Sequence, residues 1–331
     1  MAVGSIVWFP SAQPDDWSPC KLVSRSPGGG AQLKIKGAVV NVAPEDSHLI
    51  LPNGESTVPN LADLPRDGLG IGGVERILRQ HFCSSLPYTD LGDSVLFVNP
   101  FRDMPIYNDQ WIDKYAALDP TLPPHIFNVA AKAYKRLYEK KQPQVLLMVG
   151  ESGTGKSRAL QHTLGFLRQT AGSGEDADER IEAFPIALQP FLSVRCALGS
   201  ISWLSTRALL LLTLRFDDDG FVGGTSAIVR LFESSRVSSC TGGRNFEALY
   251  LALRDDSARD WVGDREEFCL LGDDVDLEEF DEDGVELSKW RDALEFFGLD
   301  IAGVVRFLCG ILLLGEINFV ASSSGVVGQP P

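Results

Sequence analysis

A run of glycine, lysine and hydroxyl side chains carries the clearest chemistry in the sequence. Gly150-Glu-Ser-Gly-Thr-Gly-Lys-Ser157 matches GxxxxGK[ST], the pattern of a phosphate-binding loop. Glycines let the backbone adopt positive φ, so that several N–H groups can converge on phosphate oxygens. Lys156 can add a positive charge for the β and γ phosphates, and the Ser157 hydroxyl can ligate Mg²⁺. The run therefore predicts a site for a nucleoside triphosphate with Mg²⁺, made by Gly150, Glu151, Ser152, Gly153, Thr154, Gly155, Lys156 and Ser157.

The elements on either side of this loop fit that prediction. Val145-Leu-Leu-Met-Val149 is a continuous apolar run of strand length, typical of a parallel sheet that is covered on both faces. A helical pattern follows the loop, and another helix is expected from Pro123 to about Lys141. Strand, glycine loop and helix in this order predict an α/β fold with nucleotide at the helix N-terminus.

A second carboxylate near Mg²⁺ is expected in such a site. The apolar run from Leu209 to Phe216 ends at Asp217-Asp-Asp-Gly220. Taken alone, this could be a Walker B strand with Asp217 on the metal. It could equally be a strand that ends in an acidic β-turn, because Asp-Gly is a strong hairpin signal. Local reasoning leaves both alternatives open.

The N-terminal part of the chain reads as a separate small β unit. Short β-prone runs between Val7 and Leu51 are separated by Pro, Gly and Asp clusters, a spacing typical of a small barrel. We expect a β-barrel over residues 1–58, a nucleotide-binding domain over 59–319 and a tail without regular structure over 320–331.

Composition excludes several other classes of protein. The net charge of the 331 residues is −15, so a broad nucleic-acid-binding surface is not expected. The segment Asp264–Glu286 holds twelve carboxylates and one cation, so the acidity is local. It reads as a solvated loop rather than a Ca²⁺ site, because it lacks EF-hand spacing. The six cysteines form no CxxC pair, and no apolar run is long enough to span a bilayer.

The blocks around the loop resemble the myosin motor head, in the family's order from about Asp63 to Phe319. Asn99-Pro-Phe-Arg-Asp-Met-Pro-Ile-Tyr107 is similar to the family's purine-binding segment, and the loop differs from the myosin GESGAGKT at Thr154 and Ser157. Further blocks resemble LEKSRV (Leu231–Val237), ERNFHIFYQL (Arg244-Asn-Phe246) and AILHLGNIEF (Gly310–Phe319).

The resemblance implies a P-loop NTPase with a mostly parallel central sheet flanked by helices, preceded by an SH3-like β-barrel. It implies MgATP hydrolysis coupled to movement on an actin filament, in a cytoplasmic, cytoskeleton-associated protein. Asn99, Pro100 and Tyr107 would flank the adenine. The acidic turn at Asp217 would join two strands away from Mg²⁺. The stretch Glu175–Arg180 would be an exposed, variable loop.

One region departs from the family's pattern. Switch I of myosins reads NNNSSRFGK, and its counterpart here matches only at Ser205, Thr206 and Arg207. By resemblance, Lys156, Ser205 and Arg207 would be catalytic, and Ser157 and Ser205 would ligate Mg²⁺. Ser202-Trp-Leu204 stands where the family has amides, which removes hydrogen-bond donors from the γ-phosphate. Losing one such donor lowers the rate about 10²- to 10³-fold.

Switch II of the family would lie beyond Pro331. We therefore expect open strand edges and exposed apolar surface in the second half of the chain. Two alternatives to a hydrolysing motor stay open. One is a nucleotide-binding portion that does not hydrolyse ATP, and the other is a different P-loop NTPase that uses Asp217 for Mg²⁺.

Overall fold

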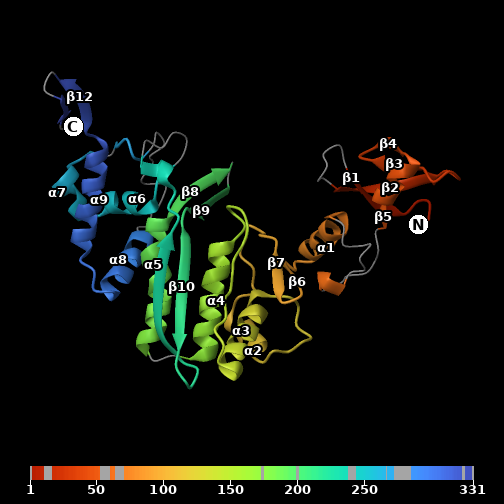
Figure 1. Cartoon of the computed structure of the whole chain (residues 1–331), viewed down its shortest axis with the longest axis horizontal. Coiled ribbons are helices and arrows are strands. Elements are labelled where there is room, and N and C mark those ends of the chain that lie inside the picture. Colours follow the sequence, from red (N-terminus) through yellow and green to blue (C-terminus); the bar gives the residue numbers. More distant parts are fainter. Residues whose placement is uncertain are drawn as a thin grey trace. The chain divides into compact units, whose positions relative to one another are not determined.

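The computed structural model describes residues 2–10, 17–52, 60–63, 71–172, 175–198, 201–237, 244–265, 267–271, 285–322 and 325–329. These residues form two compact units, Met1–Val145 and Leu146–Pro331, and each is described by itself. The boundary predicted near residue 58 and most of the acidic segment after Asp264 lie outside the described residues. Figure 1 shows the elements of both units.

The first unit opens with an antiparallel sheet of five strands in the order β4-β3-β2-β1-β5. Val7, Leu22 and Leu33 lie in a core that belongs to this sheet alone. The strands fall where the short β-prone runs predict them. Among the described residues β4 and β5 are not paired, so closure into an SH3-like barrel stays a prediction. The strands are β1 (Ile6–Pro10), β2 (Trp17–Arg25), β3 (Ala31–Ile35), β4 (Ala38–Val42) and β5 (Leu51–Pro52).

The rest of the first unit combines three helices with one hairpin. The predicted helix after Pro123 is confirmed as α3, and His125 caps it by accepting a hydrogen bond from Phe127 N at 3.1 Å. Aromatic rings of β6, α2 and α3 pack against one another around His125. The elements are α1 (Ile71–Cys83), β6 (Tyr88–Leu91), β7 (Ser94–Phe97), α2 (Asp109–Ala116) and α3 (Ile126–Lys140).

The second unit consists of helices and antiparallel hairpins. Its elements are α4 (Lys156–Ala171), α5 (Glu175–Leu192), β8 (Ser193–Leu198), β9 (Ile201–Thr206), β10 (Leu209–Phe216), β11 (Val222–Arg230), α6 (Glu247–Arg254), α7 (Arg259–Val262), α8 (Val285–Phe296), α9 (Ile301–Gly315), β12 (Asn318–Ser322) and β13 (Gly325–Gln329). A core of apolar side chains from α5, α6, α8 and α9 surrounds Trp290, whose indole N–H donates to Ala187 O at 3.2 Å.

The prediction of a strand over Val145–Val149 is wrong for the described structure. This segment is extended but pairs with no described strand, and Val145, Leu147 and Val149 are 84%, 77% and 80% exposed. A strand needs neighbours for its backbone N–H and C=O groups, and apolar composition alone does not provide them. All the ladders between described strands are antiparallel, so the mostly parallel central sheet stays a prediction.

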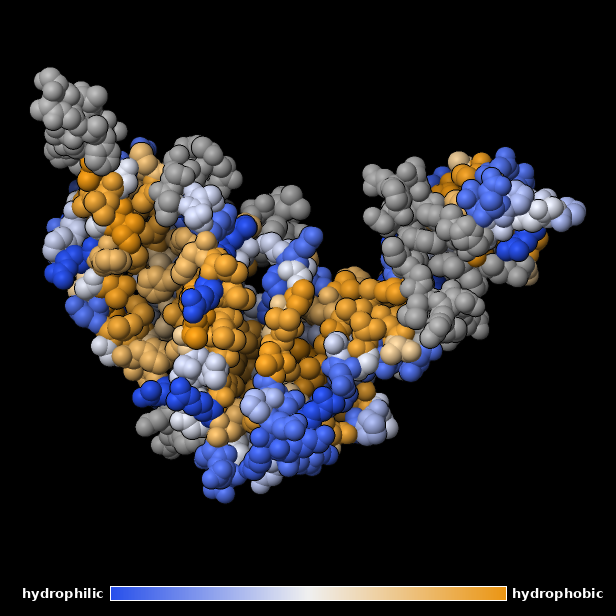
Figure 2. All heavy atoms as spheres, viewed as in Figure 1, coloured by the Kyte–Doolittle hydropathy of each residue, from blue (hydrophilic) through white to orange (hydrophobic). Residues whose placement is uncertain are grey.

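Two further segments differ from expectation. Residues from Glu175 onward form the first turns of α5 rather than a loop. From Val320 onward, where no regular structure was expected, the chain pairs as the β12–β13 hairpin. The apolar segment Ile301–Gly315 forms α9, and Phe307 and Leu314 on this helix are exposed. Figure 2 shows hydrophobic residues at the surface along α9 and over β10.

Candidate functional site

The predicted phosphate loop adopts a conformation that depends on its glycines. Gly150, Gly153 and Gly155 all have positive φ, at 152°, 81° and 90°. A Cβ atom on Gly150 would lie 2.7 Å from the Thr154 hydroxyl oxygen, closer than real side chains come. The backbone of this loop can therefore curve as it does only because these positions lack side chains.

Lys156 begins helix α4 and folds back over the loop. Its ammonium donates to Gly150 O at 2.7 Å and to Glu151 O at 2.6 Å, while the Thr154 hydroxyl donates to Glu151 O at 2.7 Å. These contacts place one positive charge over the loop. The loop leads into a sixteen-residue helix, and the N-terminus of a helix is itself electropositive. Loop, lysine and helix together suit a polyphosphate anion.

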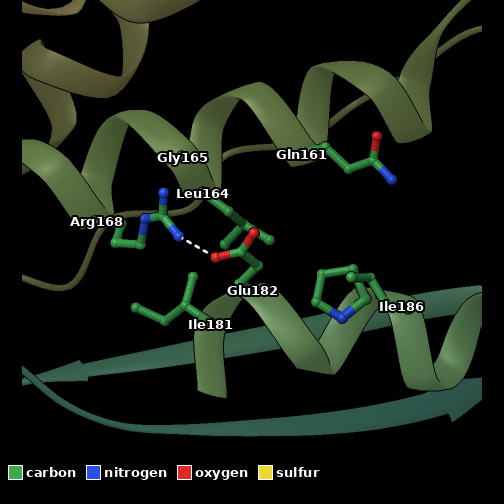
Figure 3. Close-up of a pocket in the computed structure, with 8 residues that line it drawn as sticks. Gln161, Leu164, Gly165, Arg168, Ile181, Glu182 and Ile186 are labelled. Carbon is green, nitrogen blue, oxygen red and sulfur yellow. Dashed lines mark hydrogen bonds and ion pairs between the residues drawn. The ribbon is translucent and has the colours of Figure 1, made fainter. Parts of the chain in front are cut away.

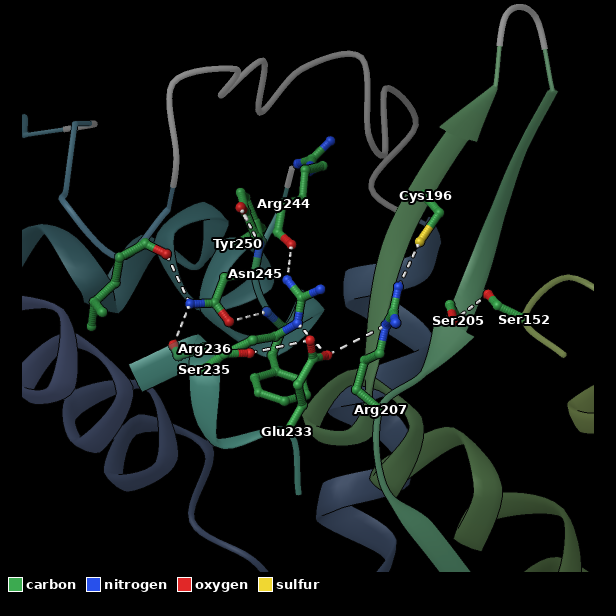
Figure 4. Close-up of polar contacts among 12 residues, drawn as sticks. Ser152, Cys196, Ser205, Arg207, Glu233, Ser235, Arg236, Arg244, Asn245 and Tyr250 are labelled. Carbon is green, nitrogen blue, oxygen red and sulfur yellow. Dashed lines mark hydrogen bonds and ion pairs between the residues drawn. The ribbon is translucent and has the colours of Figure 1, made fainter. Parts of the chain in front are cut away.

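The end of β9 forms the second side of the site. The Ser152 and Ser205 hydroxyl oxygens are 2.7 Å apart, and those of Ser157 and Thr206 are 3.0 Å apart. Ser205 is buried, whereas Ser157 is exposed. Sequence comparison matched Thr206 to the family's switch I but gave it no role, and here it is the hydroxyl nearest to Ser157. Figure 4 shows Ser205 and Ser152 turned toward each other.

The residues present fit a bound nucleotide with Mg²⁺. Lys156 places a positive charge over the loop, and the hard hydroxyl oxygens of Ser157 and Thr206 lie 3.0 Å apart beside it. Hydroxyl and phosphate oxygens are ligands that Mg²⁺ accepts, with water completing the shell. Among the described residues there is no cluster of three His, Cys, Asp or Glu side chains that could hold a metal by itself.

Arg207 does not join these hydroxyls. Its guanidinium donates to Cys196 Sγ at 3.4 Å, and its Nε lies 3.6 Å from Glu233 Oε2 (Figure 4). Its backbone is held as well, since Arg207 N donates to Leu192 O at 2.7 Å. The arrangement thus brings Ser205 to the phosphate loop but directs the predicted catalytic Arg207 toward Cys196 and Glu233.

Glu233 belongs to a polar network that reaches helix α6. It accepts from Arg236 Nε at 2.9 Å, and Arg236 Nη1 donates to Arg244 O at 2.8 Å. The Asn245 amide then donates to Arg236 O at 3.1 Å. The hydrogen bond from Arg236, with the charges of Arg236 and Arg207, holds the pKa of the Glu233 carboxyl below its usual range. The network therefore keeps Glu233 ionised as a partner for both arginines.

The Asp217 carboxylate stabilises the turn between β10 and β11. β10 and β11 are an antiparallel hairpin, and the Asp217 carboxylate accepts from Phe221 N at 2.8 Å across the connection. Gly220 has φ of 91° there, which suits glycine. β10 separates this turn from the Thr206 end by eight residues, about 25 Å of extended chain. The alternative that uses Asp217 on Mg²⁺ has no support in this geometry.

The predicted adenine-contacting residues lie in the first unit. The Asn99 amide oxygen accepts from Phe101 N at 3.1 Å, and the Tyr107 and Tyr88 hydroxyls are 2.8 Å apart. Tyr88 is buried, and its burial raises the pKa of its hydroxyl well above the usual range. Tyr107 is thus held by a buried ring, while the contact of Asn99, Pro100 and Tyr107 with adenine stays a prediction.

A pocket of about 240 Å³ lies between α4 and α5 (Figure 3). Gly165 opens this space because it has no side chain, and Pro185 interrupts the α5 hydrogen-bond pattern opposite it. Arg168 and Glu182 form an ion pair across its rim. None of the predicted site residues lines the pocket, so it is separate from the phosphate loop.

The loop, Lys156 and the facing hydroxyls have the arrangement expected of a P-loop, and the comparisons with known proteins identify the family. The family model "Myosin head (motor domain)" matches residues 72–330, well over half of the chain. The chain therefore belongs to the myosin head family, whose fold is that of a P-loop NTPase.

Individual relatives give the same result. "Myosin-13" of Arabidopsis thaliana is 27% identical over 359 residues, covering 99% of this chain and 22% of that protein. "High molecular weight form of myosin-1" of Acanthamoeba castellanii is 29% identical over 319 residues, covering 91% of this chain and 20% of that protein. The chain spans about a fifth of the length of the curated relatives it matches.

No single helix among the described residues is long and apolar enough to cross a membrane. Helices α8 and α9 reach that composition only as a pair, and they are bent by 117° at the break between them.

Proposed function

We propose that this chain binds MgATP through Gly150–Ser157 and forms the nucleotide-binding portion of a myosin-type motor. One observation carries the proposal: the loop hydroxyls of Ser152 and Ser157 lie 2.7 Å and 3.0 Å from those of Ser205 and Thr206. Two segments almost fifty residues apart in sequence thereby meet at a lysine-containing glycine loop. Such convergence is what phosphate and Mg²⁺ binding requires.

In this proposal the chain's residues bind and position rather than react. The Lys156 ammonium exchanges its carbonyl partners for phosphate oxygens, and the loop N–H groups donate to the same anion. Ser157 and Ser205 would ligate Mg²⁺, with the Thr206 hydroxyl beside that of Ser157. Bound Mg²⁺ supplies positive charge that neutralises the phosphate oxygens. Asn99, Pro100 and Tyr107 hold the adenine.

The complete protein would then hydrolyse ATP and move on an actin filament, in the cytoplasm and in association with the cytoskeleton. These properties follow from family membership and extend beyond the part that this chain spans. The proposed partners are an actin filament and ATP.

A hydrolysis-deficient nucleotide-binding portion is the second candidate. Two observations favour it: Arg207 is engaged by Glu233 and Cys196, and Trp203 and Leu204 stand where myosins have amides. A phosphate-release assay with and without actin filaments separates the two candidates. Actin-stimulated release above background supports the motor, whereas nucleotide binding without release supports the second candidate.

The binding proposal is tested by Lys156→Ala, with MgATP affinity measured by isothermal titration calorimetry. Removing the charge that faces the phosphates costs at least about thirtyfold in affinity. Lys289→Ala is the matched control, because Lys289 is an exposed lysine on α8 of the same unit. Equal MgATP affinity of Lys156→Ala and the unmodified chain would overturn the proposal.

A further inference from the structure

The hairpin β8–β9 lies between the phosphate loop and the N-terminus of helix α6. Val194 of β8 pairs with Ser205 of β9, and on its other side Val194 forms an antiparallel bridge with Phe246. Phe246 is the residue before Glu247, which begins α6. The start of α6 is therefore one strand away from a hydroxyl that meets the phosphate loop.

Glu247 is a buried acid at this position. Its side chain is 3% exposed, and Oε1 lies 3.8 Å from Arg195 Nε. Arg195 is on β8, where it pairs with Leu204, the residue before Ser205. The guanidinium also lies 3.5 Å from Glu286 at the start of α8. Arg195 thus links the hairpin to the N-termini of two helices.

The charge of Glu247 depends on a balance within this cluster. The charged groups that face it, among the described residues, are Arg195 of β8, Arg244 before α6 and Glu286 of α8. Burial raises the pKa of the Glu247 carboxyl to about 7, although both arginines act in the opposite direction. An exposed glutamate would be fully ionised near neutral pH, whereas this one gains or loses its charge there.

We propose that Glu247 is a positioning residue, whose ionised carboxylate anchors Arg195 and so holds Ser205 and Thr206 against the phosphate loop. When Glu247 takes up a proton, its carboxyl becomes neutral and no longer attracts the Arg195 guanidinium toward the start of α6. The β8–β9 hairpin is then held less firmly, and MgATP or MgADP binds more weakly. The inference rests on the proposed function, in that the hairpin is taken as one side of the nucleotide site.

The first test measures MgADP affinity of the full chain at about pH 6 and about pH 8. We compare the unmodified chain with Glu247→Gln, which removes the charge but keeps the shape. At the higher pH the unmodified chain should bind about fivefold more tightly than Glu247→Gln, and at the lower pH the two should agree. The nucleotide's own titration is common to all variants and cancels in this comparison.

Glu295→Gln is the matched control. Glu295 is an exposed glutamate on α8, outside the cluster, so the same chemical change there should leave the pH profile of the unmodified chain intact. If the MgADP affinity of Glu247→Gln kept the full pH dependence of the unmodified chain, the inference would be overturned. If Glu247→Gln does not fold, Arg195→Gln replaces it and should flatten the profile in the same way.

Hydrogen exchange without nucleotide separates this inference from the proposed function. After correction for intrinsic rates, amides of residues 201–207 should exchange faster at the lower pH in the unmodified chain. That difference should vanish in Glu247→Gln. A chain that does not bind MgADP but shows this exchange pattern would refute the proposed function alone. If the chain binds MgADP but Glu247→Gln shows the same pH-dependent exchange as the unmodified chain, the positioning role alone is refuted.

Discussion

The loop Gly150–Ser157 and the end of β9 face each other, but they are held in place differently. The loop is fixed by contacts within itself, from Lys156 to two of its carbonyls and from Thr154 to Glu151 O. The end of β9 is fixed by other elements. Arg207 N donates to Leu192 O of α5 at 2.7 Å, and Glu233 N donates to Arg207 O at 3.1 Å.

The two sides can therefore be perturbed from different parts of the chain. A change within the eight-residue loop should disrupt phosphate binding directly, because each contact is local. A change far from β9, in α5, α6 or the segment around Glu233, should reach Ser205 and Thr206 through backbone contacts.

Gly150→Ala should break the loop side. The new Cβ would meet the Thr154 hydroxyl at 2.7 Å, and φ of 152° is strained for alanine. Strain of this kind costs about 1–3 kcal/mol, so MgATP affinity should fall about tenfold. Titration calorimetry measures it. Thr154→Ala in the same chain should restore part of the loss by removing the clash, and an undiminished affinity of Gly150→Ala would contradict the loop geometry.

Ser205→Ala should weaken the β9 side with a smaller effect. The variant removes one hydroxyl beside Ser152, so Mg²⁺-dependent affinity should fall about fivefold, the size of one ordinary hydrogen bond between uncharged groups. A Mg²⁺ titration at fixed ATP measures it. Asp217→Asn is the control, because Asp217 caps a turn and should not matter. A tenfold loss in Asp217→Asn would restore the alternative that places Asp217 on the metal.

Glu233→Gln should affect stability more than binding. Since the folded-state pKa of Glu233 is lowered, its contribution is present above the ordinary glutamate pKa and is lost as pH falls through the lowered value. The side chain is partly exposed, so the free energy of unfolding should fall only by about 0.5–1 kcal/mol near pH 7. Urea unfolding at neutral and acidic pH measures it. A loss that is equal at both pH values would contradict the ion-pair explanation.

The sequence predicted the loop well because its determinants are local. Three glycines, a lysine and a following helix pattern suffice to specify Gly150–Ser157, and α4 begins at Lys156 as expected. The acidic turn at Asp217 was likewise recognisable from Asp-Gly chemistry and from the family resemblance.

The rest depends on contacts distant in sequence. Nothing near Arg207 indicates that its partners are Cys196 and Glu233, and the spacing of Ser205 and Thr206 does not reveal which loop hydroxyl each one meets. The prediction of a strand over Val145–Val149 is wrong for the same reason, because apolar composition predicts burial but does not supply the neighbouring strands. Glu247 was not singled out, since its burial comes from packing of α6 against β8, α5 and α9.

In the proposed function, the hydroxyls of the loop and of β9 form one site for MgATP. A double-mutant cycle of Ser157→Ala and Thr206→Ala, read out as Mg²⁺-dependent ATP affinity, tests it most directly, because these hydroxyls lie 3.0 Å apart. The two losses should be non-additive by at least about 0.5 kcal/mol, roughly a twofold difference in affinity. Strictly additive losses, or no effect of Thr206→Ala, would contradict the claim.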